Sequence, residues 1–133
     1  MQYHFDESLG VGCKLGSGEE SDITAQILEN HKKCIYDDSI IVFHHTGESK
    51  YDIDMERHIK YCRGFGGLCA KHIYEIKNKY FYCIYYKKNV RTRIGLILSY
   101  LKRDKYLQTL YKTTLKSRKE GFLEYKSMVI GDK

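Results

Sequence analysis

The first part of the chain has hydrophobic positions at helical spacing. Ile23, Ile27, Leu28 and His31 stand at i, i+4, i+5 and i+8, directly after the acidic sequence GEESD. Ser21 can cap the first backbone amides of a helix, and the neighbouring acids favour the positive end of the helix dipole. The pattern therefore predicts a first helix that ends near Lys33.

The middle of the chain changes from a strand-like to a helical pattern. Residues 39–45, SIIVFHH, form a run of β-branched and aromatic side chains, which indicates a buried strand. Met55, Ile59 and Cys62 follow at helical spacing, and Gly64 is placed to end that second helix.

Residues 70–88 have the pattern of a β-hairpin. Side chains alternate between two faces from Ala70 to Lys77, and Asn78-Lys79 supplies a turn. The sequence that follows, YFYCIYYKK, is rich in aromatic and β-branched residues, which suit a partner strand. These residues predict an aromatic hairpin.

After Asn89 the hydrophobic period becomes helical. The two apolar stripes are Ile94, Ile97, Leu98 and Leu101, and then Leu107, Leu110, Tyr111 and Leu115. A phase slip near Arg103-Asp104 indicates two helices or one bent helix. The side opposite the second stripe carries Lys105, Lys112, Lys116 and Lys119. Gly121 is expected to end this helix, and residues 122–130 to form a last strand.

These elements predict an α+β fold. We expect one small domain over residues 1–133, with a mostly antiparallel sheet, a central aromatic hairpin and C-terminal amphipathic basic helices. A chain of 133 residues can bury a core without disulfides or metals. The five cysteines form no CxxC pair, so we expect free thiols in a reducing compartment.

Charge is distributed unevenly along the chain. Residues 1–86 contain 10 Lys and Arg against 13 Asp and Glu, whereas residues 87–133 contain 13 against 4. Such an excess attracts polyanions and favours a nucleic-acid partner. No stretch has the length and apolar character of a membrane span, and the polar start does not resemble a secretory signal, so we expect a cytoplasmic protein without membrane contact. The absence of Pro and Trp, with abundant Lys, Ile and Tyr, suggests an AT-rich genome such as that of a phage or virus.

The charge pattern predicts non-catalytic binding of a nucleic acid or a nucleotide-like phosphate ligand, without a cofactor. Basic side chains of the last third would contact phosphates, and Tyr80, Tyr82, Tyr85 or Tyr86 would offer rings on which bases stack. Arg63 precedes consecutive glycines, whose backbone a phosphate can approach closely. The predicted ligand-binding residues are Arg63, Tyr82, Arg91, Arg93, Lys105, Lys112, Lys116 and Lys119. The sequence does not decide whether the protein forms a homo-oligomer.

Several short stretches resemble motifs of nucleic-acid enzymes and binders. Ile73-Tyr74, followed by Arg93, resembles part of the GIY-YIG nuclease pattern, which implies metal-assisted phosphodiester hydrolysis around Tyr74 and Arg93, with Glu120 or Glu124 as the later glutamate. Cys83, or Tyr82 with a shift, stands in place of the second motif tyrosine, and both motif glycines are absent.

A second nuclease-like pattern is Glu75-Ile76-Lys77. It resembles the E-x-K half of restriction-endonuclease-like sites, which implies Mg²⁺ binding by the glutamate, although Asp52 and Asp54 precede a helix and not the hairpin. Alternation alone predicts that Lys71, Glu75 and Lys77 are the solvent face of the hairpin.

Two further resemblances are shorter. Residues 63–70, RGFGGLCA, are similar to the octamer of RNA-recognition motifs, with Phe65 at a stacking position. His44-x-Thr46 is similar to one of the two motifs of two-histidine phosphoesterases, and the chain has no second one.

Four metal-capable side chains, His58, Cys62, Cys69 and His72, occur within 15 residues. His58-x3-Cys62 has a spacing that zinc ligands use on a helix, and structural thiols with core histidines are the alternative. A third class of function also stays open, namely a viral protein–protein interaction or a factor that blocks host defence. The basic charge would then serve protein recognition.

Overall fold

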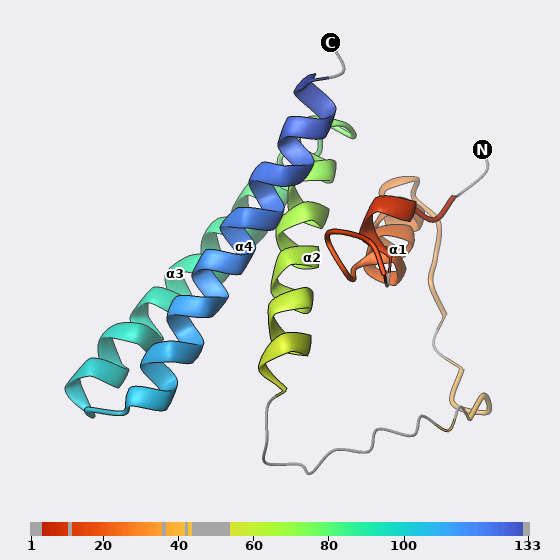
Figure 1. Ribbon diagram of the computed structural model, residues 1–133. Coiled ribbons are helices and arrows are strands. Elements are labelled where there is room, and N and C mark those ends of the chain that lie inside the picture. Colours follow the sequence, from red (N-terminus) through yellow and green to blue (C-terminus); the bar gives the residue numbers. More distant parts are fainter. Residues whose placement is uncertain (1–3, 11, 36, 42, 44–53, 132–133) are drawn as a thin grey trace.

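The structure, a computed structural model, describes residues 4–10, 12–35, 37–41, 43 and 54–131. Its elements are the 3-10 helix η1 (Glu7–Leu9) and the helices α1 (Glu19–Glu29), α2 (Met55–Tyr74), α3 (Tyr80–Leu101) and α4 (Lys105–Gly131). Helices α3 and α4 form a long antiparallel hairpin, and α2 runs parallel to α4 beside it (Figure 1). The segment with η1 and α1 lies on the other side of α2 in this view.

The described residues contain no strand, so the predicted α+β fold with its antiparallel sheet is wrong. The predicted aromatic hairpin is the end of α2 and the start of α3. Asn78 does lie at a turn, where its Oδ1 accepts a hydrogen bond from the Tyr80 backbone N–H at 2.9 Å. The aromatic side chains that suit a strand also fall three or four residues apart, and Phe81, Ile84 and Tyr85 pack on the core from one side of α3.

The other predicted strands are not present in the described residues either. Residues 122–130 continue α4. Of the sequence SIIVFHH, Ile40, Ile41 and Phe43 are exposed and outside any regular element. His44, His45 and Thr46 lie outside the described residues, as does Asp52.

Glycines explain why two helices are longer than predicted. Helix α2 continues through Gly64 and Gly66, and α4 continues through Gly121. A Cβ atom on Gly66 would lie 2.1 Å from the backbone oxygen of Arg118, and one on Gly121 would lie 2.0 Å from that of Arg63. The missing side chains therefore let α2 and α4 approach backbone to backbone. These glycines are contact residues and not helix ends.

Two predicted helix boundaries are confirmed. Asp54 begins α2, because its Oδ1 accepts hydrogen bonds from the backbone N–H groups of Glu56 and Arg57. Asp104 begins α4 in the same way, accepting from the Leu107 N–H at 2.9 Å. The phase slip in the sequence therefore marks a break between two helices.

The hydrophobic core lies near one end of the α3–α4 hairpin. Its buried members are Leu9, Leu15, Leu68, Cys69, Ala70, Ile73, Phe81 and Tyr125. They come from the N-terminal segment, the second half of α2, the start of α3 and the end of α4. The opposite end of the hairpin extends beyond this core (Figure 1). Within the described ranges, no helix has the length and apolar character needed to cross a membrane.

Candidate nucleic-acid interface

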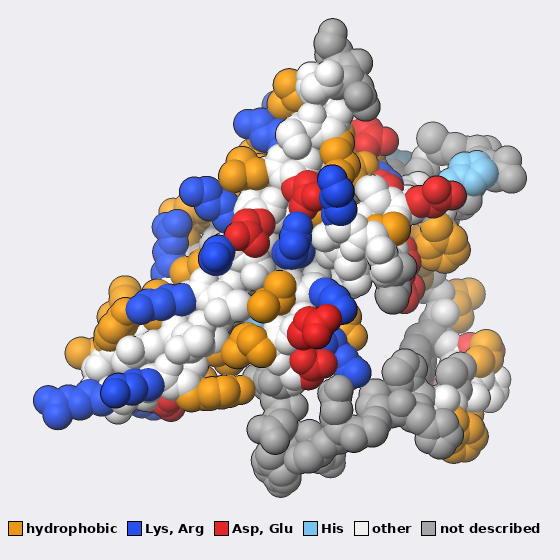
Figure 2. All heavy atoms as spheres, in the orientation of Figure 1, with side chains coloured by type: hydrophobic (Ala, Val, Ile, Leu, Met, Phe, Trp, Pro, Cys, Tyr) orange, Lys and Arg blue, Asp and Glu red, His pale blue; other side chains and the backbone are white. Residues whose placement is uncertain are grey.

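Four lysines form one exposed row on α4. They are Lys105, Lys112, Lys116 and Lys119, and all are exposed. Their spacings of seven, four and three residues place them on one side of a helix with about 3.6 residues per turn. At about 1.5 Å per residue the row is about 21 Å long. Lys and Arg side chains are numerous along the α3–α4 flank in Figure 2.

A groove between α3 and α4 brings part of the predicted set together. Arg93 of α3 lines it with Lys116 and Lys119 of α4, around a cavity of about 390 Å³. Asn89 also lines the groove, and its Oδ1 atom is buried without a hydrogen-bond partner. Tyr85 also lines the groove and is partly buried. Burial raises the pKa of its hydroxyl. Three cations thus line one groove.

Tyrosine rings accompany this row of cations. Tyr82, Arg93 and Tyr100 share one side of α3, because they are separated by eleven and seven residues. Lys112 Nζ lies 5.3 Å from the centroid of the Tyr100 ring, and both side chains contact solvent. Tyr82 is 48% exposed, so its ring is available for stacking. A hydrogen bond with Tyr74 raises the pKa of the Tyr82 hydroxyl.

We call this surface the α3–α4 basic face. Its members are Arg93, Lys105, Lys112, Lys116 and Lys119, with Tyr82, Tyr85 and Tyr100.

Two predicted binding residues lie elsewhere. Arg63 belongs to α2, and its Nη2 donates to Glu124 Oε2 at 2.7 Å. Arg91 lies in a second groove, on another side of α3, with Lys88 and Arg118. Neither shares the groove of Arg93, and the glycines after Arg63 are inside a helix, so the loop expected to receive a phosphate is not present there.

Acidic side chains neutralise little of the basic face. Between residues 80 and 131 the sequence has twelve Lys and Arg against three Asp and Glu. Asp104 caps α4, and Glu124 pairs with Arg63 of α2. Glu120 lies 3.9 Å from Lys116 Nζ, and such an exposed pair contributes little.

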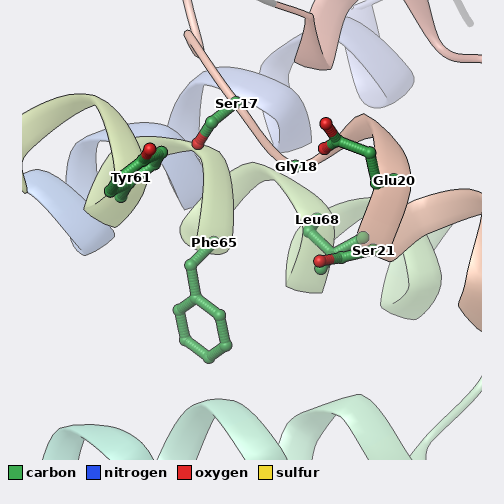
Figure 3. A pocket seen from close by; sticks show the side chains of 7 residues that line it. All are labelled: Ser17, Gly18, Glu20, Ser21, Tyr61, Phe65 and Leu68. Atoms are coloured by element: carbon green, nitrogen blue, oxygen red, sulfur yellow. The ribbon is translucent and has the colours of Figure 1, made fainter. Parts of the chain in front are cut away.

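The pocket at the start of α1 does not suit a phosphate. It has a volume of about 260 Å³ and is lined by Ser17, Gly18, Glu20, Ser21, Tyr61, Phe65 and Leu68 (Figure 3). Among the described residues that line it, Glu20 carries the only charged side chain, a carboxylate. A phosphate would therefore meet a like charge there.

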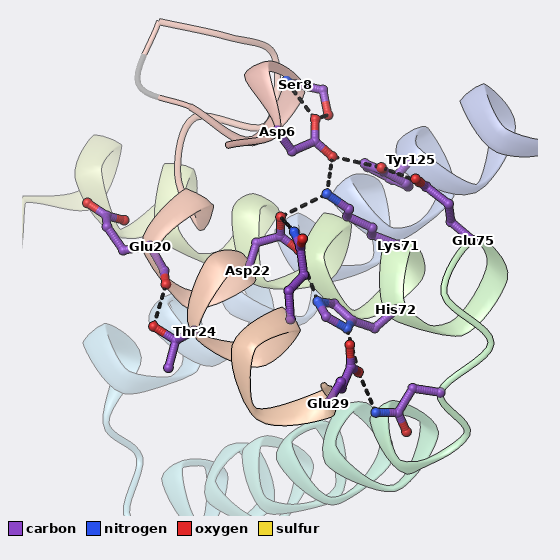
Figure 4. Close-up of polar contacts among 12 residues, drawn as sticks. Asp6, Ser8, Glu20, Asp22, Thr24, Glu29, Lys71, His72, Glu75 and Tyr125 are labelled. Atoms are coloured by element: carbon purple, nitrogen blue, oxygen red, sulfur yellow. Dashed lines mark hydrogen bonds and ion pairs between the residues drawn. The ribbon is translucent and has the colours of Figure 1, made fainter. Parts of the chain in front are cut away.

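A buried ionic cluster joins the N-terminal segment to the helices, and we call it the ionic clamp (Figure 4). Lys71 Nζ lies 2.8 Å from both Asp6 Oδ2 and Asp22 Oδ2. The ring of His72 lies 3.0 Å from Asp22 Oδ1 through Nε2 and 2.8 Å from Glu29 Oε1 through Nδ1. Asp22 and His72 are fully buried, and Lys71 is 6% exposed. The clamp consists of Asp6, Asp22, Glu29, Lys71 and His72.

Two carboxylates of the clamp, those of Asp6 and Asp22, have lowered pKa values. Burial alone would raise the pKa of Asp6, but hydrogen bonds from Lys71, Ser8 and Tyr125 outweigh it and lower the pKa to about 2. Burial is likewise outweighed at Asp22, whose pKa is lowered by hydrogen bonds from His72 and Lys71. Each of the five clamp residues is thus paired with another residue of the protein. Such pairing is typical of a cluster that stabilises the fold.

This cluster corrects two sequence interpretations. Lys71, Glu75 and Lys77 were expected on the solvent face of a hairpin. Glu75 and Lys77 are exposed, at the end of a helix and not on a strand, but Lys71 is buried. Glu75 also accepts a hydrogen bond from the Tyr125 hydroxyl at 2.7 Å. The strand positions that E-x-K and GIY-YIG sites use do not exist here, because residues 72–74 end α2 and Arg93 lies in α3.

The four metal-capable side chains do not converge. His58 Nε2 lies 3.5 Å from Cys62 Sγ and 2.7 Å from Thr114 Oγ1. Cys69 is fully buried in the hydrophobic core, where burial raises the pKa of its thiol to about 12. The ring of His72 faces carboxylates. The described part of the chain has no group of three or more His, Cys, Asp or Glu side chains placed to hold a metal ion, and all five cysteines are free.

Sequence reasoning missed one member of the basic face and one residue of its groove as binding residues. Tyr100 lies seven residues after Arg93, and Asn89 lies seven residues after Tyr82. The spacing of seven residues has a meaning only if residues 80–101 form one helix. The expected strand placed Tyr82 in a different element from Tyr100. No protein-family profile, curated protein or solved structure matches this chain.

Proposed function

We propose that this protein binds nucleic acid, without catalysis, through the α3–α4 basic face. The observation that carries the proposal is the row of cations on α4, joined by Arg93 in one groove and accompanied by exposed tyrosine rings. Lys and Arg side chains that neutralise phosphates release condensed counterions, which supplies most of the affinity in sequence-independent binding.

The shape of the face favours a polymer over a single nucleotide. The lysine row is about 21 Å long, which exceeds the size of one nucleotide and matches several successive phosphates. Tyrosine rings beside a cationic track are typical of proteins that bind single strands, because an unpaired base can stack on an aromatic ring. A single-stranded nucleic acid is therefore the ligand that the face suits best.

A binding role also fits the surroundings of the face better than a nuclease role. The described residues bring no pair of free carboxylates to the groove of Arg93, and Glu120 is the nearest acid on the α4 row. Phosphodiester hydrolysis by metal ions needs such carboxylates as ligands. A binding protein of this size and charge suits a cytoplasmic accessory role in a phage or virus.

Charge reversal on the basic face tests this proposal. Lys116→Glu combined with Lys119→Glu is expected to weaken binding of a fluorescent single-stranded oligonucleotide at least about tenfold at low salt. Fluorescence anisotropy measures the affinity, and the fold should persist because both side chains are exposed.

The matched control is Lys32→Glu combined with Lys33→Glu. These exposed lysines follow α1, and the substitution changes the net charge by the same amount away from the basic face. The control should keep most of the affinity. Equal losses in both variants would mean that only the net charge matters, and no binding by the unmodified protein would remove the proposal.

A further inference from the structure

An apolar stripe on α3 is exposed, although its spacing in the sequence is that of a core-facing helix. Ile94, Ile97, Leu98 and Leu101 are 54%, 60%, 50% and 76% exposed. They stand at i, i+3, i+4 and i+7, the spacing by which a helix docks on an apolar partner surface. Hydrophobic side chains gather toward the free end of the α3–α4 hairpin in Figure 2 as well.

The fold explains why this stripe stays uncovered by the described elements. Helix α4 packs on another side of α3, through contacts such as the Arg118 Nη1 bond to Thr92 Oγ1 at 2.9 Å. The ring contacts between α2 and α3 lie near the start of α3, where Phe65 and His72 meet Tyr85 and Phe81. The stripe is in the second half of α3, beyond these contacts. A contiguous apolar surface of this kind commonly marks an interaction site.

Basic side chains border the stripe in one groove and at the hairpin turn. A groove of about 430 Å³ adjoins Ile94 and Leu98 and is also lined by Lys88, Arg91 and Arg118. Lys102 and Arg103 follow the stripe at the hairpin turn and are exposed. Asp104, the nearest acid, is engaged as the cap of α4. Carboxylates are the groups that such arginines bind best, often through two parallel hydrogen bonds.

We propose that this stripe is a docking site for a protein partner that presents an amphipathic helix with an apolar ridge flanked by Asp and Glu. The ridge would pack on Ile94, Ile97, Leu98 and Leu101, and carboxylates would enter the groove of Lys88, Arg91 and Arg118. A second copy of this chain would bring the like charges of this groove and of the turn together. Insertion of the hairpin end into a lipid layer would bury the charged turn at Lys102 and Arg103.

This site is separate from the proposed nucleic-acid face. The stripe and its groove share no lining residue with the groove of Arg93, Lys116 and Lys119. One surface would therefore bind a nucleic acid while the other binds a protein, and the two activities should be lost independently.

A synthetic helical peptide tests the docking site on the intact protein. The probe has leucines along one side and glutamates on both flanks of that side, and a comparison peptide carries lysines in place of the glutamates. We expect saturable binding of the glutamate peptide and at least about tenfold weaker binding of the lysine peptide. Ile97→Asp should weaken binding of the glutamate peptide at least about tenfold.

Leu28→Asp is the matched control, because Leu28 of α1 is 54% exposed and lies outside the stripe. It should leave peptide binding unchanged, and circular dichroism should show both variants as helical as the unmodified protein. Equal affinity for the two peptides, or no effect of Ile97→Asp, would overturn the proposal. So would an Ile97-dependent attachment to phosphatidylserine vesicles, or an Ile97-dependent self-association in sedimentation, if the glutamate peptide does not bind.

Discussion

Gly121→Ala is expected to lower the free energy of unfolding by about 3 kcal/mol, because the new methyl group would collide with backbone and not with a movable side chain. Its Cβ would lie 2.0 Å from the backbone oxygen of Arg63 and 2.7 Å from the carbonyl carbon of that residue. Relief requires that α2 and α4 separate, which disturbs the most extensive helix contact of the fold. Urea unfolding followed by circular dichroism measures the loss.

Gly131→Ala provides the control within the same helix. A Cβ atom on Gly131 would meet nothing within 4 Å. Alanine favours helices over glycine by up to about 1 kcal/mol, so this variant should be as stable as the unmodified protein or slightly more stable. If both alanine variants unfold alike, the backbone contact between α2 and α4 does not exist.

Lys71→Met is the second substitution with a large expected effect. Lys71 is the only cation within hydrogen-bond distance of both Asp6 and Asp22 in the described ionic clamp. Removal of one partner from a buried ion pair leaves an uncompensated charge, which costs about 3–5 kcal/mol. We expect a loss of this size in thermal or urea unfolding, with the N-terminal segment released from the helices.

Lys60→Met is the matched control for this substitution. Lys60 also lies on α2 and pairs with Glu56 at 2.6 Å, but both side chains are exposed. An exposed pair of this spacing contributes little to stability, because solvent screens it. Combining Lys71→Met with Asp22→Asn should recover part of the loss, since it removes the orphaned charge. A similar small loss for Lys60→Met and Lys71→Met would contradict the buried position of the clamp.

The clamp also predicts how stability depends on pH. The pKa values of Asp6 and Asp22 are lower in the folded protein than the value of about 3.9 expected for an unfolded chain. The unfolded state therefore binds more protons in acid, and the contribution of the clamp is complete above about pH 4 and is lost as the pH falls toward 2. Because Lys71→Met removes a cause of both shifts, its unfolding free energy should change less over this range.

The helices were predictable from the sequence wherever the hydrophobic period was unambiguous. Ile23 and Ile27 indicate α1, and the phase slip at Arg103-Asp104 locates the turn between α3 and α4 correctly. Residues 70–88 mislead, because aromatic and β-branched side chains favour strands only weakly and tertiary packing decides. Their helical partners are distant in the chain, as in the contact of Tyr85 with Phe122 at 4.5 Å between ring centroids.

Glycine gave the other misleading signal. Gly64 and Gly121 were expected to end helices, since glycine commonly does so. Here they lie inside α2 and α4, where the close approach of another segment leaves no room for a side chain. A single sequence does not distinguish a glycine that ends a helix from one that admits a neighbour, because the neighbour is about fifty residues away.

The candidate site was predictable in part, because it depends on spacing within one helix. The four lysines of α4 share a side by their spacing alone. Arg93 lies in the groove of Lys116 and Lys119, and Arg91 lies in another groove. The rotation of α3 against α4 decides this difference, and it is known only from the packed structure. The ionic clamp was invisible for a similar reason, since Asp6, Asp22 and Lys71 are far apart in the chain.

The salt dependence of single-strand binding tests the nucleic-acid face most directly. If Arg93, Lys112, Lys116 and Lys119 each contact a phosphate, the slope of log K against log salt concentration should be about −3, since each contact contributes about −0.7. Neutralising two of them, by Lys116→Gln with Lys119→Gln, should make the slope shallower by about 1.4. An identical slope for the two proteins would show that these lysines do not contact the nucleic acid, and the proposed face would then be wrong.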